Sequence, residues 1–147
     1  MTFIEWITSL WKRRKPPPLP PTPPPDNGDM LALHNAERQR RRVLTLVPDA
    51  RLTSAAQAHA TWMAERGELS HTGLHDRVSR VGYPWTKVAE NVAAGAGLDA
   101  RGAWMLWMAS PGHLANAVDP AMRDVGFGSA VGRDGHTYWC TVYGRTG

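Results

Sequence analysis

The stretch "DVGFGSAVGRDGHTYWCTVYG", residues 124–144, predicts a β-hairpin near the end of the chain. Two runs rich in β-branched and aromatic residues flank "RDG" (133–135), which has the chemistry of a tight hairpin turn. In the second run two sets alternate: Tyr138, Cys140 and Val142 on one face, and Trp139, Thr141 and Tyr143 on the other. Both faces are largely apolar, so the sheet must be covered on both sides.

Helical patterns precede this hairpin. They lie at 29–44, 52–67, 74–83, 98–110 and 111–118, with a strand pattern, "KVAENVAAG", at 87–95. Expected capping residues are Asp29, Thr53 or Ser54, and Asp99, and Gly67 is expected to end the second helix. Helices on both sides of a sheet predict an α+β fold, a three-layer α-β-α sandwich.

Charge is unevenly distributed along the chain. The net charge is +4, and the first 25 residues hold four basic residues against one acid, which leaves the remainder near +1. A nucleic-acid-binding domain carries its excess positive charge on the folded surface, so we expect no nucleic-acid partner. The run "RQRRR" (38–42) is predicted to form a solvated helix face, with a surface for an anionic partner as the alternative. Cys140, the single cysteine, is expected to be a buried structural thiol.

The N-terminal segment "MTFIEWITSLWKRRK", residues 1–15, has apolar residues at helical spacing followed by a basic cluster. It is too short to span a bilayer, and the order is wrong for a secretory signal. Three interpretations stay open: a helix lying in a membrane surface, a peptide that docks into a partner, or a helix packed on its own domain.

The segment "PPPLPPTPPP", residues 16–25, forces polyproline II and forms a semi-rigid spacer of about 30 Å. The predicted organisation is therefore an anchor or docking peptide (1–15), a polyproline linker (16–28) and a folded domain (29–147). A spacer is useful when both ends bind something, which favours display of the domain from a larger assembly. An envelope complex or a virus particle is such an assembly, and the expected location is an envelope, extracellular or virion surface.

Three titratable residues stand out: His71 in "LSHTG", Glu90 in "VAENVA" and His113 in "SPGHLAN". An acid within an apolar strand such as Glu90 needs a partner. Ser110 and Pro111 suit a helix start, which places His113 near the positive helix end and favours neutral imidazole. Two imidazoles and a carboxylate match an open zinc site, or equally an acid/base set.

A series of motifs in order resembles one family: "MLALHNAER" (30–38), "SAAQAHATWMAERGELSHTG" (54–73), "AENVAAG" (89–95), "WMLWMASPGHLANAV" (104–118), "DVGFGSAV" (124–131) and "YWCTVYG" (138–144). Together they look like the CAP superfamily of cysteine-rich secretory proteins, antigen 5 and pathogenesis-related 1, in its bacterial SCP-like form. The resemblance implies an α-β-α sandwich with a central antiparallel sheet and a cleft that contains two histidines and one or two acids.

Carried onto this chain, the resemblance assigns His71 and His113 as the cleft histidines and Glu90 as the acid of a "GEN"-like motif, with Ala89 in place of its usual glycine. The position of a second acid holds Ser110. The sharper hypothesis is a divalent cation such as zinc bound by His71 and His113, with Glu90 as a ligand or a partner behind the ligands.

The remaining polar residues near these motifs are expected to be structural. Asn91 and Asn116 should hold the backbone, His34 and His59 should be hydrogen-bonded within the fold, and His75 and His136 should be exposed. The favoured function is a surface or envelope-associated binding module for a small polar, lipid or glycan ligand. The alternative is a metal-dependent hydrolase of peptides, esters or glycans, with Glu90 as general base.

Overall fold

The structure, a computed structural model, describes residues 27–147. The elements are α2 (Asn27–Arg40), β1 (Val47–Pro48), α3 (Ala50–Arg66), α4 (Leu74–Arg80), β2 (Trp85–Ala96), α5 (Ala100–Met108), α6 (Pro111–Ala117), β3 (Asp124–Val131) and β4 (His136–Thr146). The predicted N-terminal peptide (1–15) and the proline run (16–25) lie outside the described residues.

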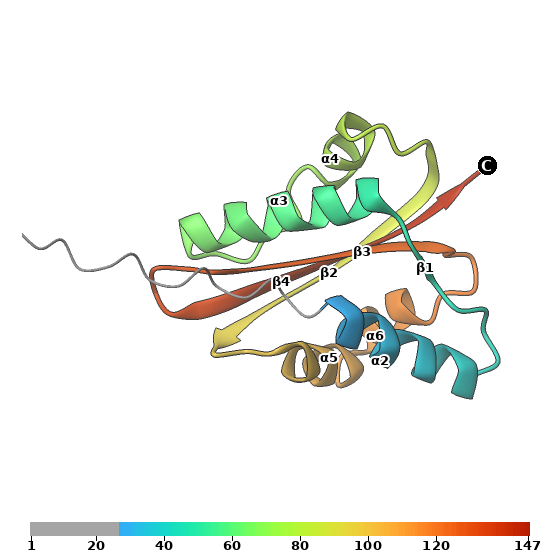
Figure 1. Ribbon diagram of the computed structural model, residues 1–147, viewed down its shortest axis with the longest axis horizontal. Coiled ribbons are helices and arrows are strands. Elements are labelled where there is room, and N and C mark those ends of the chain that lie inside the picture. Colours follow the sequence, from blue (N-terminus) through green and yellow to red (C-terminus); the bar gives the residue numbers. More distant parts are fainter. Residues whose placement is uncertain (1–26) are drawn as a thin grey trace, which may run out of the picture.

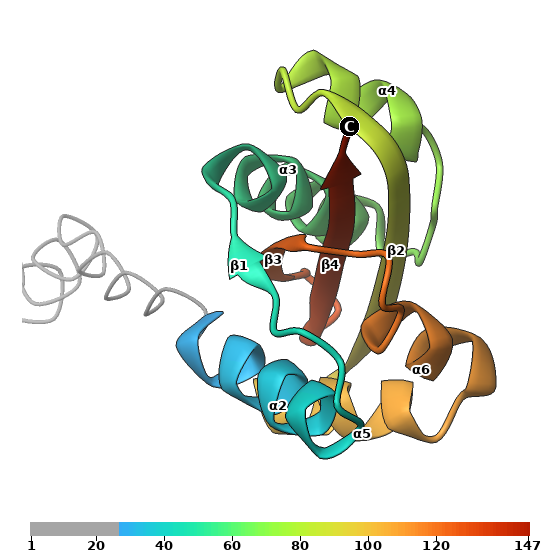
Figure 2. The same ribbon diagram turned by 90° about the vertical axis from the view of Figure 1, so that its right-hand side faces the viewer.

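The helices form two layers around one sheet, which confirms the predicted α+β three-layer sandwich. Helices α3 and α4 cover one face, and α2, α5 and α6 cover the other (Figures 1 and 2). The strand order is β1-β3-β4-β2. Strand β4 pairs antiparallel with β2 and with β3, as expected, whereas β1 pairs parallel with β3 and makes the sheet mixed. The two-residue β1 is too short to show a periodic pattern in the sequence.

The alternation along β4 produces two cores, as the sequence predicts. Tyr138, Cys140 and Val142 pack with α3, while Trp139 and Tyr143 pack with α2 and α5. Two glycines of β3 allow α3 to lie close to the sheet. A Cβ atom at Gly126 would collide with the backbone of Leu52, and one at Gly128 would collide with the backbone of Gln57.

The helix ends agree with the sequence at two points and differ at two. Gly67 ends α3 with a left-handed φ of 67°, and Asp99 caps α5 by accepting from the backbone N–H of Gly102. Helix α3, however, starts earlier than Thr53 or Ser54, because Asp49 caps it and accepts from two backbone N–H groups. Helix α2 begins at Asn27, so Asp29 lies in its first turn rather than at the cap.

The arginine-rich run at the end of α2, predicted to form a solvated face, is only partly solvated. Arg38 is fully buried. Its guanidinium donates hydrogen bonds to the carbonyl oxygens of Leu44, Ala117, Asp119 and Met122, at 2.7 to 3.1 Å. The N–H groups of the guanidinium thus provide donors for carbonyl oxygens that are not paired within a helix or a strand. The two arginines at 40 and 41 remain on the surface and pair with Glu37.

Candidate functional site

Strand β2 forms an edge of the sheet and carries the two residues around which the site is built. Neighbouring residues of a strand point to opposite faces. Glu90 therefore faces the α3 and α4 layer, where Cys140 lies, and Asn91 faces the α2, α5 and α6 layer, where Tyr143 lies. Both side chains are buried. The outward carbonyl of Glu90 accepts from the amide of Asn116, which protects this exposed edge of the strand.

Glu90 is the centre of a charged network. Its Oε1 accepts from His71 Nδ1 at 3.0 Å, and its Oε2 pairs with Arg77 Nη2 at 2.8 Å. The buried thiol of Cys140 donates to Oε2 at 3.4 Å, and burial raises the pKa of that thiol well above its usual value. The acid that the sequence placed in an apolar strand is thus paired and hydrogen-bonded, as burial of a carboxylate requires.

His71 links this buried carboxylate to the surface. It lies in the loop between α3 and α4, and its side chain is 59% exposed whereas that of Glu90 is 1% exposed. Because a carboxylate can only accept, Nδ1 of His71 carries a proton, and in the neutral form of the ring Nε2 has the free lone pair. The loop is itself held from below, since Nε2 of His59 lies 2.6 Å from the carbonyl oxygen of Ser70.

His113 belongs to the α2, α5 and α6 layer, on the other side of the sheet from α3 and α4. It lies in the first turn of α6, after Ser110 at the cap and Pro111 at the first helical position. Burial lowers its pKa, and the charge of His71 lowers it further. The neutral imidazole predicted from the sequence is therefore favoured, but burial is the leading cause. The His113 ring makes no hydrogen bond with any residue from 27 to 147.

The two asparagines hold the backbone, as expected. Nδ2 of Asn91 donates to the carbonyl oxygen of His113 at 2.9 Å and to the hydroxyl of Tyr143 at 3.1 Å. Nδ2 of Asn116 donates to Oδ1 of Asn91 at 3.0 Å. The Ser110 side chain makes no capping hydrogen bond, and this residue occupies the position of the second acid of the implied site. These contacts fix where α6, and with it His113, lies against β2.

The predicted site residues do not form a complete set of metal ligands. Within residues 27–147, no group of three or more His, Cys, Asp and Glu side chains is arranged to hold a metal ion. Both oxygens of Glu90 are already hydrogen-bonded, which leaves the two imidazoles as the available donors. Sequence reasoning missed Arg77, which neutralises Glu90. Nothing in "LHDRVSR" distinguishes this arginine from a surface one, because its partner lies 13 residues away on another element.

The other expected histidine roles are confirmed. His34 and His59 are buried and hydrogen-bonded, and His75 and His136 are exposed. Burial lowers the pKa of His59.

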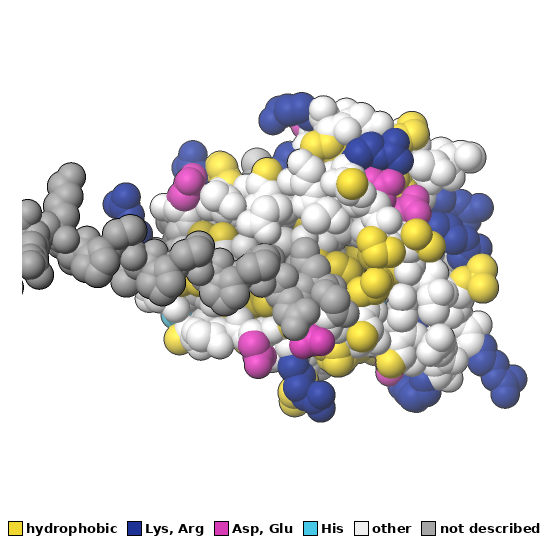
Figure 3. Space-filling model, viewed as in Figure 1, with side chains coloured by type: hydrophobic (Ala, Val, Ile, Leu, Met, Phe, Trp, Pro, Cys, Tyr) yellow, Lys and Arg dark blue, Asp and Glu magenta, His cyan; other side chains and the backbone are white. Residues whose placement is uncertain are grey.

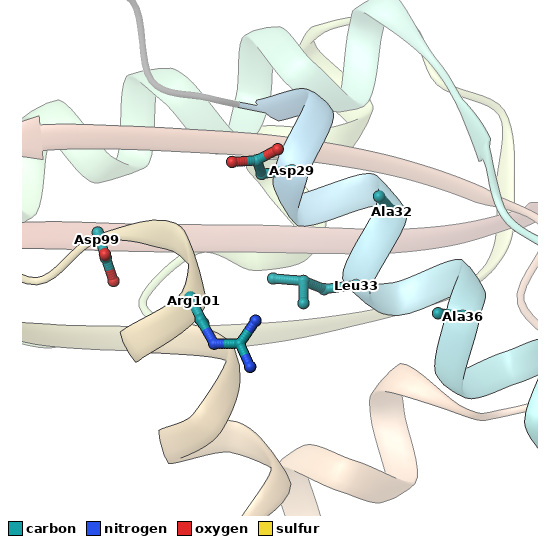
Figure 4. Close-up of a pocket in the computed structure, with 6 residues that line it drawn as sticks. All are labelled: Asp29, Ala32, Leu33, Ala36, Asp99 and Arg101. Atoms are coloured by element: carbon teal, nitrogen blue, oxygen red, sulfur yellow. The ribbon is translucent and has the colours of Figure 1, made fainter.

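A separate cavity of about 370 Å³ lies between α2 and the start of α5 (Figure 4). Asp29 and Leu33 line it from α2, and Arg101 lines it from α5. None of the candidate site residues lines this cavity. Lys and Arg side chains are spread around the rim of the face in Figure 3 rather than gathered on it. In the described part of the chain, no helix has the length and apolar character needed to cross a membrane.

The comparisons with known proteins agree with this architecture. The family model of the cysteine-rich secretory protein family, CAP, matches residues 31–143. No curated protein sequence matches the chain.

Among solved structures, an outer surface protein from Borrelia burgdorferi superposes with a TM-score of 0.77 at 17% identity, over 83% of this chain and 93% of the other. An extracellular protein containing a SCP domain from Bacillus anthracis gives 0.71 at 24%, over 81% of this chain but only 40% of its own. NaASP2, described with Zn²⁺, gives 0.60 at 14%, over 87% and 84%. At these identities the structural likeness shows the fold alone.

Proposed function

Because the chain belongs to the CAP family of cysteine-rich secretory proteins, we propose that it is a surface or envelope-associated binding module whose cleft holds a divalent cation. His71 and His113 are the proposed ligands. The observation that carries this proposal is the hydrogen bond from Nδ1 of His71 to buried Glu90, at 3.0 Å. A carboxylate behind a histidine fixes its tautomer and makes the other ring nitrogen a better metal ligand.

The role of Glu90 follows from its own contacts. With one oxygen on His71 and the other on Arg77, it orients a ligand rather than binding the metal directly. Two histidines leave open coordination positions, which suits Zn²⁺ carrying water or an exchangeable ligand. NaASP2, which shares the fold, is described with Zn²⁺. A small polar, lipid or glycan group that supplies an oxygen donor is the kind of ligand such a site accepts.

The metal-dependent hydrolase is a weaker candidate on the same evidence. It needs Glu90 to accept a proton from water, and both carboxylate oxygens are engaged by cationic or N–H donors. A buried carboxylate paired with an arginine is poorly available for proton transfer. The binding module therefore explains the geometry with fewer requirements.

Zinc titration by calorimetry on the full chain tests the proposal, with wild type beside the variant His71→Ala/His113→Ala. The matched control is His75→Ala/His136→Ala, which removes two exposed histidines elsewhere. Binding with a stoichiometry of one that is lost in the first variant and kept in the control supports the site. Equal zinc binding by wild type and the His71/His113 variant contradicts it. Binding should also weaken as the pH falls, because protonated imidazole cannot ligate a metal.

The same proposal extends to the N-terminal segments, which lie outside the described residues. We propose that residues 1–15 attach the protein to a membrane surface or a partner and that residues 16–25 hold the domain away from it. The argument is the sequence order: an aromatic, basic-flanked peptide followed by a rigid proline run. Deletion of residues 1–25 should abolish co-sedimentation with anionic vesicles or with the native assembly, and leave the circular dichroism of the domain unchanged. Co-sedimentation that survives the deletion contradicts the anchor.

A further inference from the structure

A second cavity lies behind the Glu90 network, on the α3 and α4 side of the molecule. Its volume is about 290 Å³, and its lining residues are Ala58, His59, Trp62, Thr72, Arg77 and Arg80. Small-molecule sites are concave, mostly apolar and provided with a few polar groups that fix orientation. Ala58 and Trp62 supply apolar wall, and the two arginines supply charge. The volume is at the lower end for ligand sites and matches a compact ligand.

The charge of the cavity is positive. No acidic residue is among its lining residues. Burial lowers the pKa of His59, which favours a neutral ring, so the positive charge comes from the arginines. Arg77 is balanced by Glu90, whereas Arg80 makes no ion pair or hydrogen bond with any of residues 27–147. One guanidinium at the cavity is therefore without a counter-charge.

Arg77 also has a hydrogen-bond donor without an acceptor. Its Nε donates to the carbonyl oxygen of Thr72 and its Nη2 to Glu90, but its buried Nη1 has no hydrogen-bond partner in the described part of the chain. A buried charged donor without an acceptor is costly. Because Nη1 is itself covered, an acceptor reaches it only after a small shift of the cavity wall. The oxygen of a ligand lying against Arg77 would provide that acceptor.

Contacts within the chain hold the Trp62 and Thr72 side chains that line the cavity. The ring of Trp62 stacks on His59 at 5.5 Å between centroids, and the guanidinium of Arg66 lies 4.5 Å from the Trp62 ring. His59 lies one helical turn before Trp62 and Arg66 one turn after it, so the indole is held from both sides along α3. The hydroxyl of Thr72 accepts from the side chain of Ser70, which leaves its own hydrogen free to donate.

We propose that this cavity binds a small organic anion, with a carboxylate or phosphate head at Arg77 and Arg80 and a compact apolar body against Ala58 and Trp62. Guanidinium groups pair with both kinds of head in a planar, bidentate geometry. The site is separate from the proposed metal site, since neither His71 nor His113 lines it.

The test uses the full ¹⁵N-labelled chain titrated with benzoate and with phenyl phosphate, and with neutral benzamide as the matched probe. Binding should shift the amide of Thr72 and the indole N–H of Trp62, with benzamide producing no saturable shift. A response to benzoate alone or to phenyl phosphate alone identifies the preferred head. Absence of a saturable response to both anions, or equal binding of benzamide, overturns the proposal.

Variants then locate the site. Arg80→Gln should raise the dissociation constant at least about threefold, because it removes one charged partner at an exposed position. Arg133→Gln, the same charge change in the exposed β3–β4 turn, should leave the constant unchanged. Ala58→Leu fills the cavity from an exposed helix position and should abolish the shifts, whereas Ser54→Leu, one turn earlier on α3, should not. Equal effects of Arg80→Gln and Arg133→Gln would show general charge attraction and overturn the site.

Discussion

Glu90 and Asn91 are neighbours on β2, yet they belong to two different polar networks on opposite faces of the sheet. The Glu90 network is charged: it contains Arg77 and ends at the exposed ring of His71. The Asn91 network is neutral and enclosed: the Asn91 amide donates to the Tyr143 hydroxyl, which lies 2.7 Å from Nε2 of His34. The Glu90 network reaches water at His71, whereas the path from Asn91 through Tyr143 to His34 is buried throughout.

The difference separates a network that ties elements of the fold together from one that, under the proposed function, orients a metal ligand. In the enclosed network, each donor meets an acceptor along one path, since Nδ1 of His34 donates to the carbonyl oxygen of Met30 at 2.8 Å. Such a chain ties α2 to the sheet at little electrostatic cost. A buried ion pair such as Glu90–Arg77 is weak evidence for stability, because removing two charges from water is expensive. Its orientation of His71 gives a better reason for its presence.

The largest effect is expected from breaking the charged network. Glu90→Gln keeps the side-chain volume but leaves the half-buried Arg77 cation without a counter-charge. The free energy of unfolding should fall by about 3 kcal/mol, measured by urea denaturation. The double variant Glu90→Leu/Arg77→Leu should recover most of this loss, since an apolar pair replaces the ions. A single-variant loss below about 1 kcal/mol would mean that the Arg77 charge is well solvated without Glu90.

The enclosed network makes the next largest prediction, which concerns pH. Burial and the nearby charge of Arg38 lower the pKa of His34 to about 4, against 6.5 in the unfolded chain, although its hydrogen bond to the Met30 carbonyl opposes the shift. The unfolded state therefore binds more protons than the folded state between these values. Stability from neutral His34 is fully present above pH 6.5 and is lost as the pH falls toward 4, by about 2 kcal/mol at pH 5.

His34→Gln is the control for this dependence. Glutamine does not titrate, so the difference in unfolding free energy between pH 7 and pH 5 should shrink by about the same 2 kcal/mol. His59 and His113, whose pKa values are also lowered by burial, will retain a smaller slope in the same direction. An unchanged slope in His34→Gln would assign the acid sensitivity to those two histidines instead.

Tyr143→Phe probes the enclosed network without charge. It removes the hydroxyl between His34 and Asn91 and leaves an acceptor and a donor unpaired. The expected loss is about 1 to 2 kcal/mol in urea unfolding at pH 7. Zinc binding should not change, because neither proposed ligand touches Tyr143. A lower zinc affinity in this variant would show that the two networks are coupled through β2.

The two networks also differ in how far the sequence predicts them. Periodicity along 124–144 predicts the hairpin, the apolar faces and the cover on both sides, because these depend on local alternation. By contrast, the prediction that His71, Glu90 and His113 share one cleft rests on motifs and on a family resemblance. Their contact with one another is partial: Glu90 meets His71 at 3.0 Å, while His113 keeps a free ring.

The arginines show where sequence reasoning ends. Arg38 and Arg77 both lie within basic, surface-like helical patterns, yet Arg38 is buried and Arg77 half-buried, each against partners on distant segments. A charge run predicts a solvated face because most such runs are solvated. Only the tertiary structure shows which guanidinium satisfies loop carbonyls and which neutralises a strand carboxylate. The cap of α3 at Asp49 rather than Thr53 reflects the same limit, since several polar residues there are acceptable caps.

The smallest change in stability is expected at Thr141. This residue lies on the same side of β4 as Tyr143 but makes no hydrogen bond with the enclosed network. Its Oγ1 is buried and has no hydrogen-bond partner among residues 27–147. Valine has nearly the same shape without the hydroxyl, so Thr141→Val should leave stability unchanged or raise it by up to about 1 kcal/mol. Thr137→Val, on the same strand face but partly exposed, should change stability by less than about 0.5 kcal/mol. A loss above about 0.5 kcal/mol in Thr141→Val would mean that this hydroxyl has a partner in solution, such as a bound water, and that the enclosed network extends further along β4 than Tyr143.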